Sequence, residues 1–85
     1  MTIIWSIRFR RMFSDLPGQI KERAKKQLAL FSQNPQYPSL QTKKMEGWSN
    51  IWEGRITRDW RFTFAKEGDT YTLRRIGTHE IYRNP

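Results

Sequence analysis

The residues best suited to chemistry lie in the last third of the chain. Arg55 and Arg61 fall in segments where charged and aromatic residues alternate, and the single histidine, His79, follows the last of these segments. The planar fork of arginine can hold a phosphate by two hydrogen bonds. Histidine can exchange a proton because its unperturbed pKa lies near neutral pH. Together these residues predict a phosphate-binding surface beside a proton-transfer group, the minimum needed to cleave RNA without a metal.

The same residues also have ordinary structural interpretations. Either arginine can form a cross-strand pair with a carboxylate, as charged residues often do in small sheets. The nearby carboxylates are Glu53 and Asp59. A single histidine is more often a surface or packing residue than a catalytic one. As a group, however, the arginines favour binding, because several on one face attract a phosphate backbone without specifying its bases.

Further candidates flank this region. Tyr82 and Glu80 are close to His79 in the sequence and can transfer protons, although a tyrosine so placed is more often a packed cap. Lys43 and Lys44 precede the last strands and can reach a nucleotide backbone, or they belong to a solvated turn.

Hydrophobic periodicity predicts the elements of the first half. Apolar residues alternate over residues 3–9, as in a half-buried strand. Ser14 or Asp15 can cap a helix in which Pro17 takes an early position and which ends near Ser32. The proline-rich segment that follows stops this helix, because proline lacks a backbone donor. A polar segment without clear periodicity comes next.

The second half predicts three consecutive strands. Alternation resumes over residues 51–57, 60–65 and 70–77, with tight turns between the strands. The phase slips near Arg74 and Arg75, which predicts a bulge or a strand buried on both sides. The segment after the last strand is too short to assign.

This order of elements predicts an α+β domain over residues 1–85. We expect a small, twisted, mainly antiparallel four-stranded sheet with an N-terminal helix, or a helical pair, packed on one face. Five aromatic and apolar side chains should face the helix: Trp52, Ile56, Trp60, Phe62 and Phe64. Arg55 and Arg61 must then project from the opposite, open face.

Composition limits the class of protein further. Lys and Arg outnumber Asp and Glu by 16 to 8, giving a formal net charge of +8. This charge predicts attraction to polyanions or to an acidic partner, although it also suits a generically soluble basic surface. The chain has no cysteine, which excludes disulfides and cysteine nucleophiles and fits a reducing cytoplasm. No stretch reads as an export signal or a membrane span.

Several other kinds of site are disfavoured. One histidine, no cysteine and eight scattered carboxylates do not form a zinc or two-metal pattern. The five glycines are isolated and form no phosphate-cradling loop. No serine stands in a nucleophile elbow. We therefore expect neither a metal nor an organic cofactor.

The chain resembles a known family over nearly its whole length. The segments LPGQI, NPQYPSL, KKMEG, IWEGRITRDWRFTF and GDTYTLRRIGTHEIY, taken together, are similar to the RelE/ParE superfamily of bacterial toxins. The resemblance implies a compact sheet with a helical pair on one side, and the toxin half of a type II toxin-antitoxin system. RelE-like members mostly cleave mRNA in the ribosomal A site, whereas ParE-like members inhibit DNA gyrase.

The resemblance also implies site residues. RITRDW followed by IGTHEIY is most similar to the YafQ-type ribosome-dependent ribonucleases, whose active site includes an Asp-Trp pair and a histidine after the last strand. The matching residues are Asp59, Trp60 and His79, while Arg55 stands where that group has a histidine.

Other branches of the family add to this set. The RelE and YoeB branches have an active-site arginine matching Arg61, aromatic residues similar to Tyr82, and a lysine or glutamate near Lys43 and Lys44. We expect RNA contacts from Lys43, Lys44, Arg58, Trp60 and Arg74.

In the implied mechanism, the mRNA 2′-hydroxyl attacks the adjacent phosphate. His79 transfers a proton, and Arg61 and Arg55 stabilise the charge of the transition state. Asp59 orients a neighbour or shares in proton transfer, and Tyr82 stacks on a base or assists as an acid. The expected function is a ribosome-dependent, metal-independent mRNA endoribonuclease that inhibits translation.

Two alternatives stay open at this stage: a gyrase inhibitor that acts by binding, and a basic nucleic-acid-binding domain without enzymatic activity. The expected partners are an acidic cognate antitoxin, the ribosome and mRNA. Operator DNA would be contacted only through the antitoxin, and no membrane is involved.

Overall fold

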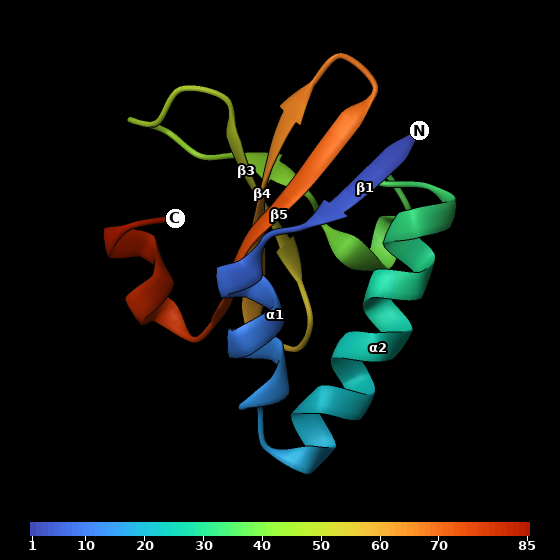
Figure 1. The fold of residues 1–85 in the computed structure, drawn as a ribbon, viewed down its shortest axis with the longest axis vertical. Helices are drawn as coiled ribbons and strands as arrows, with labels where there is room; N and C mark the ends of the chain where they lie inside the picture. Colours follow the sequence, from blue (N-terminus) through green and yellow to red (C-terminus); the bar gives the residue numbers. More distant parts are fainter.

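A five-stranded sheet and two helices make up the fold. The computed structural model describes residues 1–85, with the elements β1 (Thr2–Trp5), α1 (Ile7–Ser14), α2 (Gly18–Gln33), η1 (Pro38–Leu40), β2 (Lys43–Lys44), β3 (Ile51–Arg55), β4 (Arg61–Glu67), β5 (Thr70–Gly77) and η2 (His79–Arg83). The two η elements are short 3₁₀ helices. The strand order is β1-β5-β4-β3-β2 (Figure 1). β1 runs parallel to β5 and every other pair is antiparallel, so the α+β class is confirmed.

The predicted number of strands, four, is wrong. The additional strand, β2, contains only Lys43 and Lys44, which pair with Glu53 and Trp52 of β3. Two residues are too few to show alternation, so the sequence pattern gives no sign of this edge strand.

The N-terminal strand is also shorter than predicted, because it ends at Trp5 and α1 follows. Ser6 is the N-cap of α1, and its Oγ accepts a hydrogen bond of 3.1 Å from the Phe9 N–H. The predicted strand placed Ile7 and Phe9 on one side, yet Phe9 is fully buried and Ile7 is 80% exposed. The apolar residues after Ser6 follow a helical spacing. Of the two predicted alternatives, one helix or a helical pair, the structure therefore has the helical pair.

The predicted cap of the second helix is displaced. Pro17 is the N-cap of α2 and provides no side-chain bond, whereas Ser14 ends α1 and Asp15 is its C-cap. The two helices follow each other so closely that the polar residues expected to start one helix terminate the other. The end of α2 at Gln33 agrees with the prediction.

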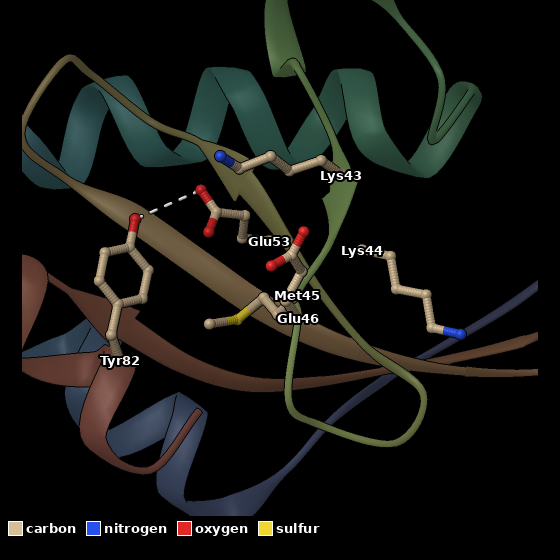
Figure 2. Close-up of a pocket in the computed structure, with 6 residues that line it drawn as sticks. All are labelled: Lys43, Lys44, Met45, Glu46, Glu53 and Tyr82. Atoms are coloured by element: carbon tan, nitrogen blue, oxygen red, sulfur yellow. Dashed lines mark hydrogen bonds between the residues drawn. The ribbon is translucent and has the colours of Figure 1, made fainter.

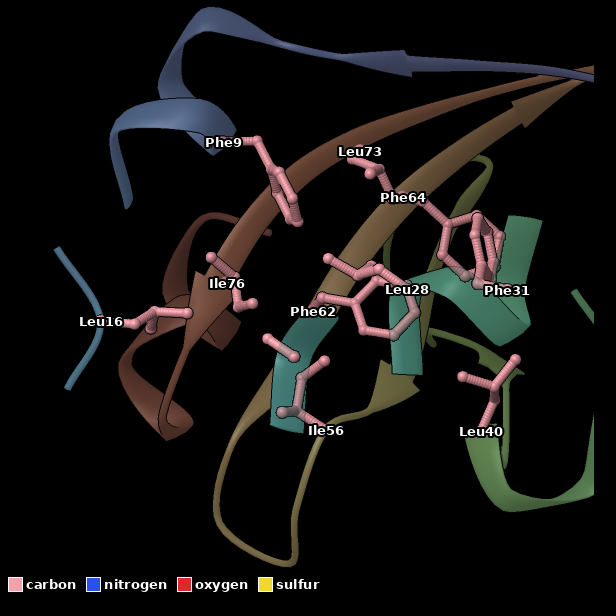
Figure 3. Close-up of a cluster of buried hydrophobic side chains, with 11 residues drawn as sticks. Phe9, Leu16, Leu28, Phe31, Leu40, Ile56, Phe62, Phe64, Leu73 and Ile76 are labelled. Carbon is pink, nitrogen blue, oxygen red and sulfur yellow. The ribbon is translucent and has the colours of Figure 1, made fainter. Parts of the chain in front are cut away.

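The core lies between the helices and one face of the sheet. Phe31 of α2 meets Phe62 and Phe64 of β4 edge to face, at 5.3 and 4.8 Å between ring centroids. Phe9 of α1 and Leu73 of β5 belong to the same cluster (Figure 3). The side chains predicted to face the helix are all in this cluster or packed against it, so the pleat prediction is confirmed. Neither helix combines the length and the apolar character that a membrane-spanning helix needs.

The predicted bulge in β5 is confirmed. Thr63 pairs with Arg75 while Phe64 pairs with Leu73, so Arg74 is the extra residue. The Thr63 hydroxyl accepts a hydrogen bond of 3.1 Å from the Arg75 N–H and donates one of 2.8 Å to the main-chain oxygen of Pro85. The bulge therefore anchors the end of the chain to the sheet.

This anchoring corrects one expectation about the sheet. The face opposite the helices is not open, because the segment from η2 to Pro85 folds over part of it. In Figure 1, α2 lies on one side of the strands and the red C-terminal segment on the other. Thr63, which faces away from the core, is fully buried beneath this segment.

Candidate functional site

A hollow of about 370 Å³ forms where the β3–β4 turn meets η2. We call it the arginine hollow, and its lining consists of Arg58, Asp59, Arg61, Thr78, His79 and Tyr82. The turn and the start of β4 provide the first three residues, and the end of the chain provides the others. All of them except Thr78 were predicted from the sequence, so the fold brings together candidates from two separate segments.

The β3–β4 turn positions Arg58 and Asp59 at its tip. The N–H groups of Ile56 and Thr57 donate to the Trp60 carbonyl at 2.9 and 3.0 Å, which closes the turn. The Trp60 side chain packs against the core. Trp60 thus anchors the turn to the core and does not line the arginine hollow, while Arg58 and Asp59 are exposed.

Arg61 is held at the edge of the arginine hollow by two partners. Its Nε and Nη2 donate to the Arg58 carbonyl at 3.3 and 3.0 Å. Its Nη1 lies 3.9 Å from Glu53 Oε1, so the cross-strand pairing considered from the sequence does occur. Asp59 forms no ion pair with Arg61 or Arg55.

Tyr82 reaches from η2 back to the sheet. Its hydroxyl donates to Glu53 Oε1 at 3.3 Å (Figure 2). Burial raises the pKa of the Tyr82 hydroxyl, the Glu53 carboxylate raises it further, and Arg61 lowers it in part. Tyr82 therefore keeps its proton at neutral pH and can donate a hydrogen bond or a proton, but cannot act as a base.

A second hollow of about 380 Å³ adjoins the first at Tyr82. We call it the lysine hollow, and it is lined by Lys43, Lys44, Met45, Glu46, Glu53 and Tyr82. In Figure 2, Lys43 extends along the side of Glu53 while Lys44 points away from it. The β2–β3 register, which places Lys43 directly opposite Glu53, agrees with this view.

Three predicted site residues lie outside both hollows. Arg55 stands opposite Arg61 in the β3–β4 register, but it lines neither hollow. Trp60 supports the turn, as described above. Arg74 donates from Nε to the main-chain oxygen of Pro85 at 3.0 Å, so its guanidinium serves to hold the end of the chain.

The sequence interpretation missed other lining residues, above all Glu53. It considered Glu53 only as a pairing partner for arginine, whereas this carboxylate is buried and contacts both Arg61 and Tyr82. The alternation in β3 gave a signal for Glu53, because it places this residue on the face opposite Trp52, where the site residues were expected. Thr78, Met45 and Glu46 gave no such signal.

Glu80 is poorly suited to supply a proton. Its carboxylate accepts hydrogen bonds from the hydroxyl and the N–H of Thr78. The bond from the Thr78 hydroxyl is the largest cause that lowers the pKa of Glu80, and the nearby His79 lowers it as well. The Glu80 carboxylate thus binds within its own loop, and His79 and Tyr82 are the lining side chains of the arginine hollow that are able to exchange a proton.

The arrangement suits an anionic ligand. Arg58 and Arg61 place cationic groups around a cavity large enough for a phosphate, and His79 lies exposed beside them. No three histidine, aspartate and glutamate side chains gather closely enough to hold a metal ion. The chemistry that these side chains offer is therefore phosphate binding combined with proton transfer.

Solved structures share this fold. The chain is similar to one chain of the RelB-RelE antitoxin-toxin complex from Methanococcus jannaschii, with 26% identity, a TM-score of 0.76, and coverage of 96% of this chain and 99% of that one. YafQ from E. coli aligns with 16% identity, a TM-score of 0.75 and 94% coverage of both chains. A YoeB/ParE toxin from Agrobacterium tumefaciens aligns with 15% identity and a TM-score of 0.69, over 93% of this chain and 99% of that one.

The family of the chain follows from its sequence match. The family model described as the ParE-like toxin domain matches residues 18–84. The chain therefore belongs to the ParE-like toxin domain family, and the resemblance to the RelE/ParE superfamily of toxins is confirmed. No curated protein sequence matches the chain.

Proposed function

We propose that this chain is the toxin of a type II toxin-antitoxin system that cleaves mRNA on the ribosome without a metal. The observation that carries the proposal is the arginine hollow, where Arg58, Arg61, His79 and Tyr82 from distant segments converge on one cavity. Cations that bind a phosphate and groups that move protons are the requirements of phosphodiester cleavage by the 2′-hydroxyl.

In the proposed reaction, the 2′-oxygen forms a bond to phosphorus and the bond from phosphorus to the 5′-oxygen breaks. A base takes the proton of the 2′-hydroxyl, and an acid protonates the leaving 5′-oxygen. His79 is assigned proton transfer, and Tyr82 donates a proton or a hydrogen bond because its raised pKa keeps it protonated. Asp59 orients a neighbouring group from the tip of the turn.

Charge stabilisation is assigned to Arg61 and Arg58. Both line the arginine hollow, whereas Arg55 does not. We therefore assign to Arg58 the charge stabilisation that the sequence suggested for Arg55. The lysine hollow continues the basic surface on the other side of Tyr82 and is suited to the next part of the mRNA backbone. The ribosome would complete the positioning of the substrate, which is worth several kcal/mol in oriented reactions.

An acidic antitoxin is the proposed partner. The solved structures of similar fold include antitoxin-toxin complexes from Methanococcus jannaschii and Pyrococcus horikoshii. The net charge of +8 would favour an acidic segment that covers the hollows. The antitoxin would make the contacts to operator DNA, and a ribosomal substrate would place the toxin in the cytoplasm.

Gyrase inhibition is the second candidate function. The observation that favours it is the family match itself, because the matching model is the ParE-like one. A gyrase inhibitor would act by binding and would not depend on His79 as a proton carrier. The two functions therefore differ in what the loss of this one side chain does.

The decisive experiment adds the purified toxin to a translation extract and maps the 5′ ends of the mRNA. The proposal expects cuts at codon-related positions, reduced by about a hundredfold or more in His79→Ala and in Arg61→Ala. Lys25→Ala, an exposed lysine of α2, is the matched control for loss of a cation and should cut like the unmodified protein.

Other outcomes would contradict the proposal. Intact mRNA together with blocked supercoiling by gyrase would identify the gyrase inhibitor. Intact mRNA, normal supercoiling and salt-sensitive RNA binding would leave a nucleic-acid-binding domain without enzymatic activity.

A further inference from the structure

We propose that Glu53 is a positioning residue that sets the geometry of Arg61 and Tyr82, and so links the arginine hollow to the lysine hollow. The inference rests on the proposed function, in which both hollows bind mRNA. Nothing in the sequence pattern or in the family resemblance assigns this role to Glu53.

The position of Glu53 in the sheet is unusual for a carboxylate. It lies in the middle of β3, between Lys43 of β2 and Thr63 of β4 in the strand register. Only 6% of the residue is exposed. A buried carboxylate carries a desolvation cost unless partners compensate for it, so its contacts explain what it does there.

One oxygen of Glu53 serves both partners. Oε1 accepts the hydrogen bond from the Tyr82 hydroxyl at 3.3 Å and lies 3.9 Å from Arg61 Nη1. Tyr82 belongs to η2 and Arg61 to β4, so these contacts link two segments to the same strand, β3. Tyr82 lines both hollows, so the hydrogen bond from its hydroxyl to Glu53 bears on the shape of each of them.

The negative charge of Glu53 also favours a positioning role. A carboxylate beside a phosphate-binding cavity repels the phosphate, so Glu53 weakens the binding of an anion unless it improves the placement of other groups. The second contact of Arg61, with the Arg58 carbonyl, leaves its guanidinium held from two directions. Preorganised cations lose less conformational freedom when a phosphate arrives.

Glu53 acts through its neighbours and does not touch the reacting atoms. It lines the lysine hollow but not the arginine hollow, where His79 lies. The oxygen nearest to Tyr82 and Arg61 is already engaged by both. The absence of Glu53 from the lining of the arginine hollow distinguishes a positioning role from that of a catalytic base.

The first test measures the pKa of Tyr82 and does not require any enzymatic activity. Ultraviolet titration of tyrosinate in Glu53→Gln should show a lower Tyr82 pKa than in the unmodified protein, because a neighbouring negative charge that raises it is gone. Tyr82→Phe identifies which of the three tyrosines gives the signal. An unchanged Tyr82 pKa would overturn the inference.

The second test compares single-turnover mRNA cleavage on the ribosome. Glu53→Gln should slow cleavage by about tenfold to a hundredfold, because the reaction depends closely on the placement of Arg61 and Tyr82. mRNA binding should change little, because the loss of repulsion and the loss of placement act on it in opposite directions. Glu67→Gln, which changes an exposed glutamate at the far end of β4, is the matched control and should cleave at the normal rate. Normal cleavage by Glu53→Gln would overturn the positioning role.

The two tests separate the inference from the proposed function. If the unmodified protein cuts no mRNA, the proposed function fails, whereas the titration still shows whether Glu53 holds Tyr82. Circular dichroism checks that Glu53→Gln is folded. If it is not, Glu53→Asp keeps the charge but shortens the side chain, and should retain a raised Tyr82 pKa while slowing cleavage.

Discussion

At the scale of single residues, Gly54 determines how β3 and β4 can pack. It pairs with Phe62, and a Cβ at Gly54 would overlap the end of the Phe62 ring. That ring is fully buried against Phe31 and has no room to move away. A glycine in the middle of a strand usually weakens it, but here the missing side chain provides the space that the aromatic core fills.

Gly54→Ala is expected to destabilise the fold by about 1–3 kcal/mol, because overpacking forces the ring or the backbone to shift. Urea unfolding monitored by tryptophan fluorescence measures the change in the free energy of unfolding. Gly18→Ala is the matched control, since a Cβ at that position has no side chain or distant backbone within 4 Å. An equal effect of both substitutions would contradict the packing explanation.

At the scale of elements, the C-terminal segment completes the site. η2 brings His79 and Tyr82 to the sheet, and the anchoring of Pro85 by Thr63 and Arg74 keeps the segment in place. Ile81, between the two site residues, is buried. The segment thus has the same importance for the site as the β3–β4 turn, although it contains no strand or α-helix.

Thr63→Val is expected to loosen this segment. The substitution removes the hydroxyl that donates to Pro85 and leaves the Arg75 N–H without its partner, which costs about 1–3 kcal/mol. Native-state hydrogen exchange should show faster exchange of the Arg75 and Ile81 amides. Thr72→Val, in β5 and without such hydrogen bonds, should leave exchange in η2 unchanged; equal acceleration by both variants would refute the anchoring role.

At the scale of the whole molecule, positive charge is in excess and largely unpaired. The ion pairs are Met1–Asp69, Glu22–Lys25 and Glu53–Arg61. Burial together with Arg8 and Arg74 lowers the pKa of Arg75, which shows how closely some of the arginines lie. Such a surface attracts polyanions at long range.

RNA binding should therefore depend strongly on salt. The measurement uses the His79→Ala variant and a single-stranded RNA. If the RNA makes roughly three to five phosphate contacts, raising the salt from about 50 to about 200 mM should weaken binding about 20- to 130-fold. Lys43→Gln combined with Lys44→Gln should reduce the slope of log affinity against log salt by about 1.4.

Lys25→Gln combined with Lys26→Gln is the control for that measurement, because it removes the same charge from the exposed side of α2. Its slope should remain that of the His79→Ala parent. A slope that falls equally in both double variants would mean that RNA binds by overall charge and not in the lysine hollow.

Features that depend on neighbours along the chain could be predicted from the amino-acid sequence. Alternation in β3, β4 and β5 placed Trp52 and Phe62 in the core and Arg61 on the opposite face, because the side-chain period of a strand is local. The break in this alternation near Arg74 predicted the bulge, because an extra residue shifts the side-chain period locally. Residue types and the family pattern then identified His79, Asp59 and Tyr82 as candidates for the site.

How these residues meet could not be predicted in this way, because it depends on long-range packing. The two-residue strand β2, the path of the C-terminal segment over the sheet and the burial of Glu53 all depend on contacts between residues far apart in the sequence. The same contacts place Arg58 in the arginine hollow and leave Arg55 outside it. A local pattern fixes the side of the sheet on which a residue lies, but the packing of distant segments determines which side chains share a cavity.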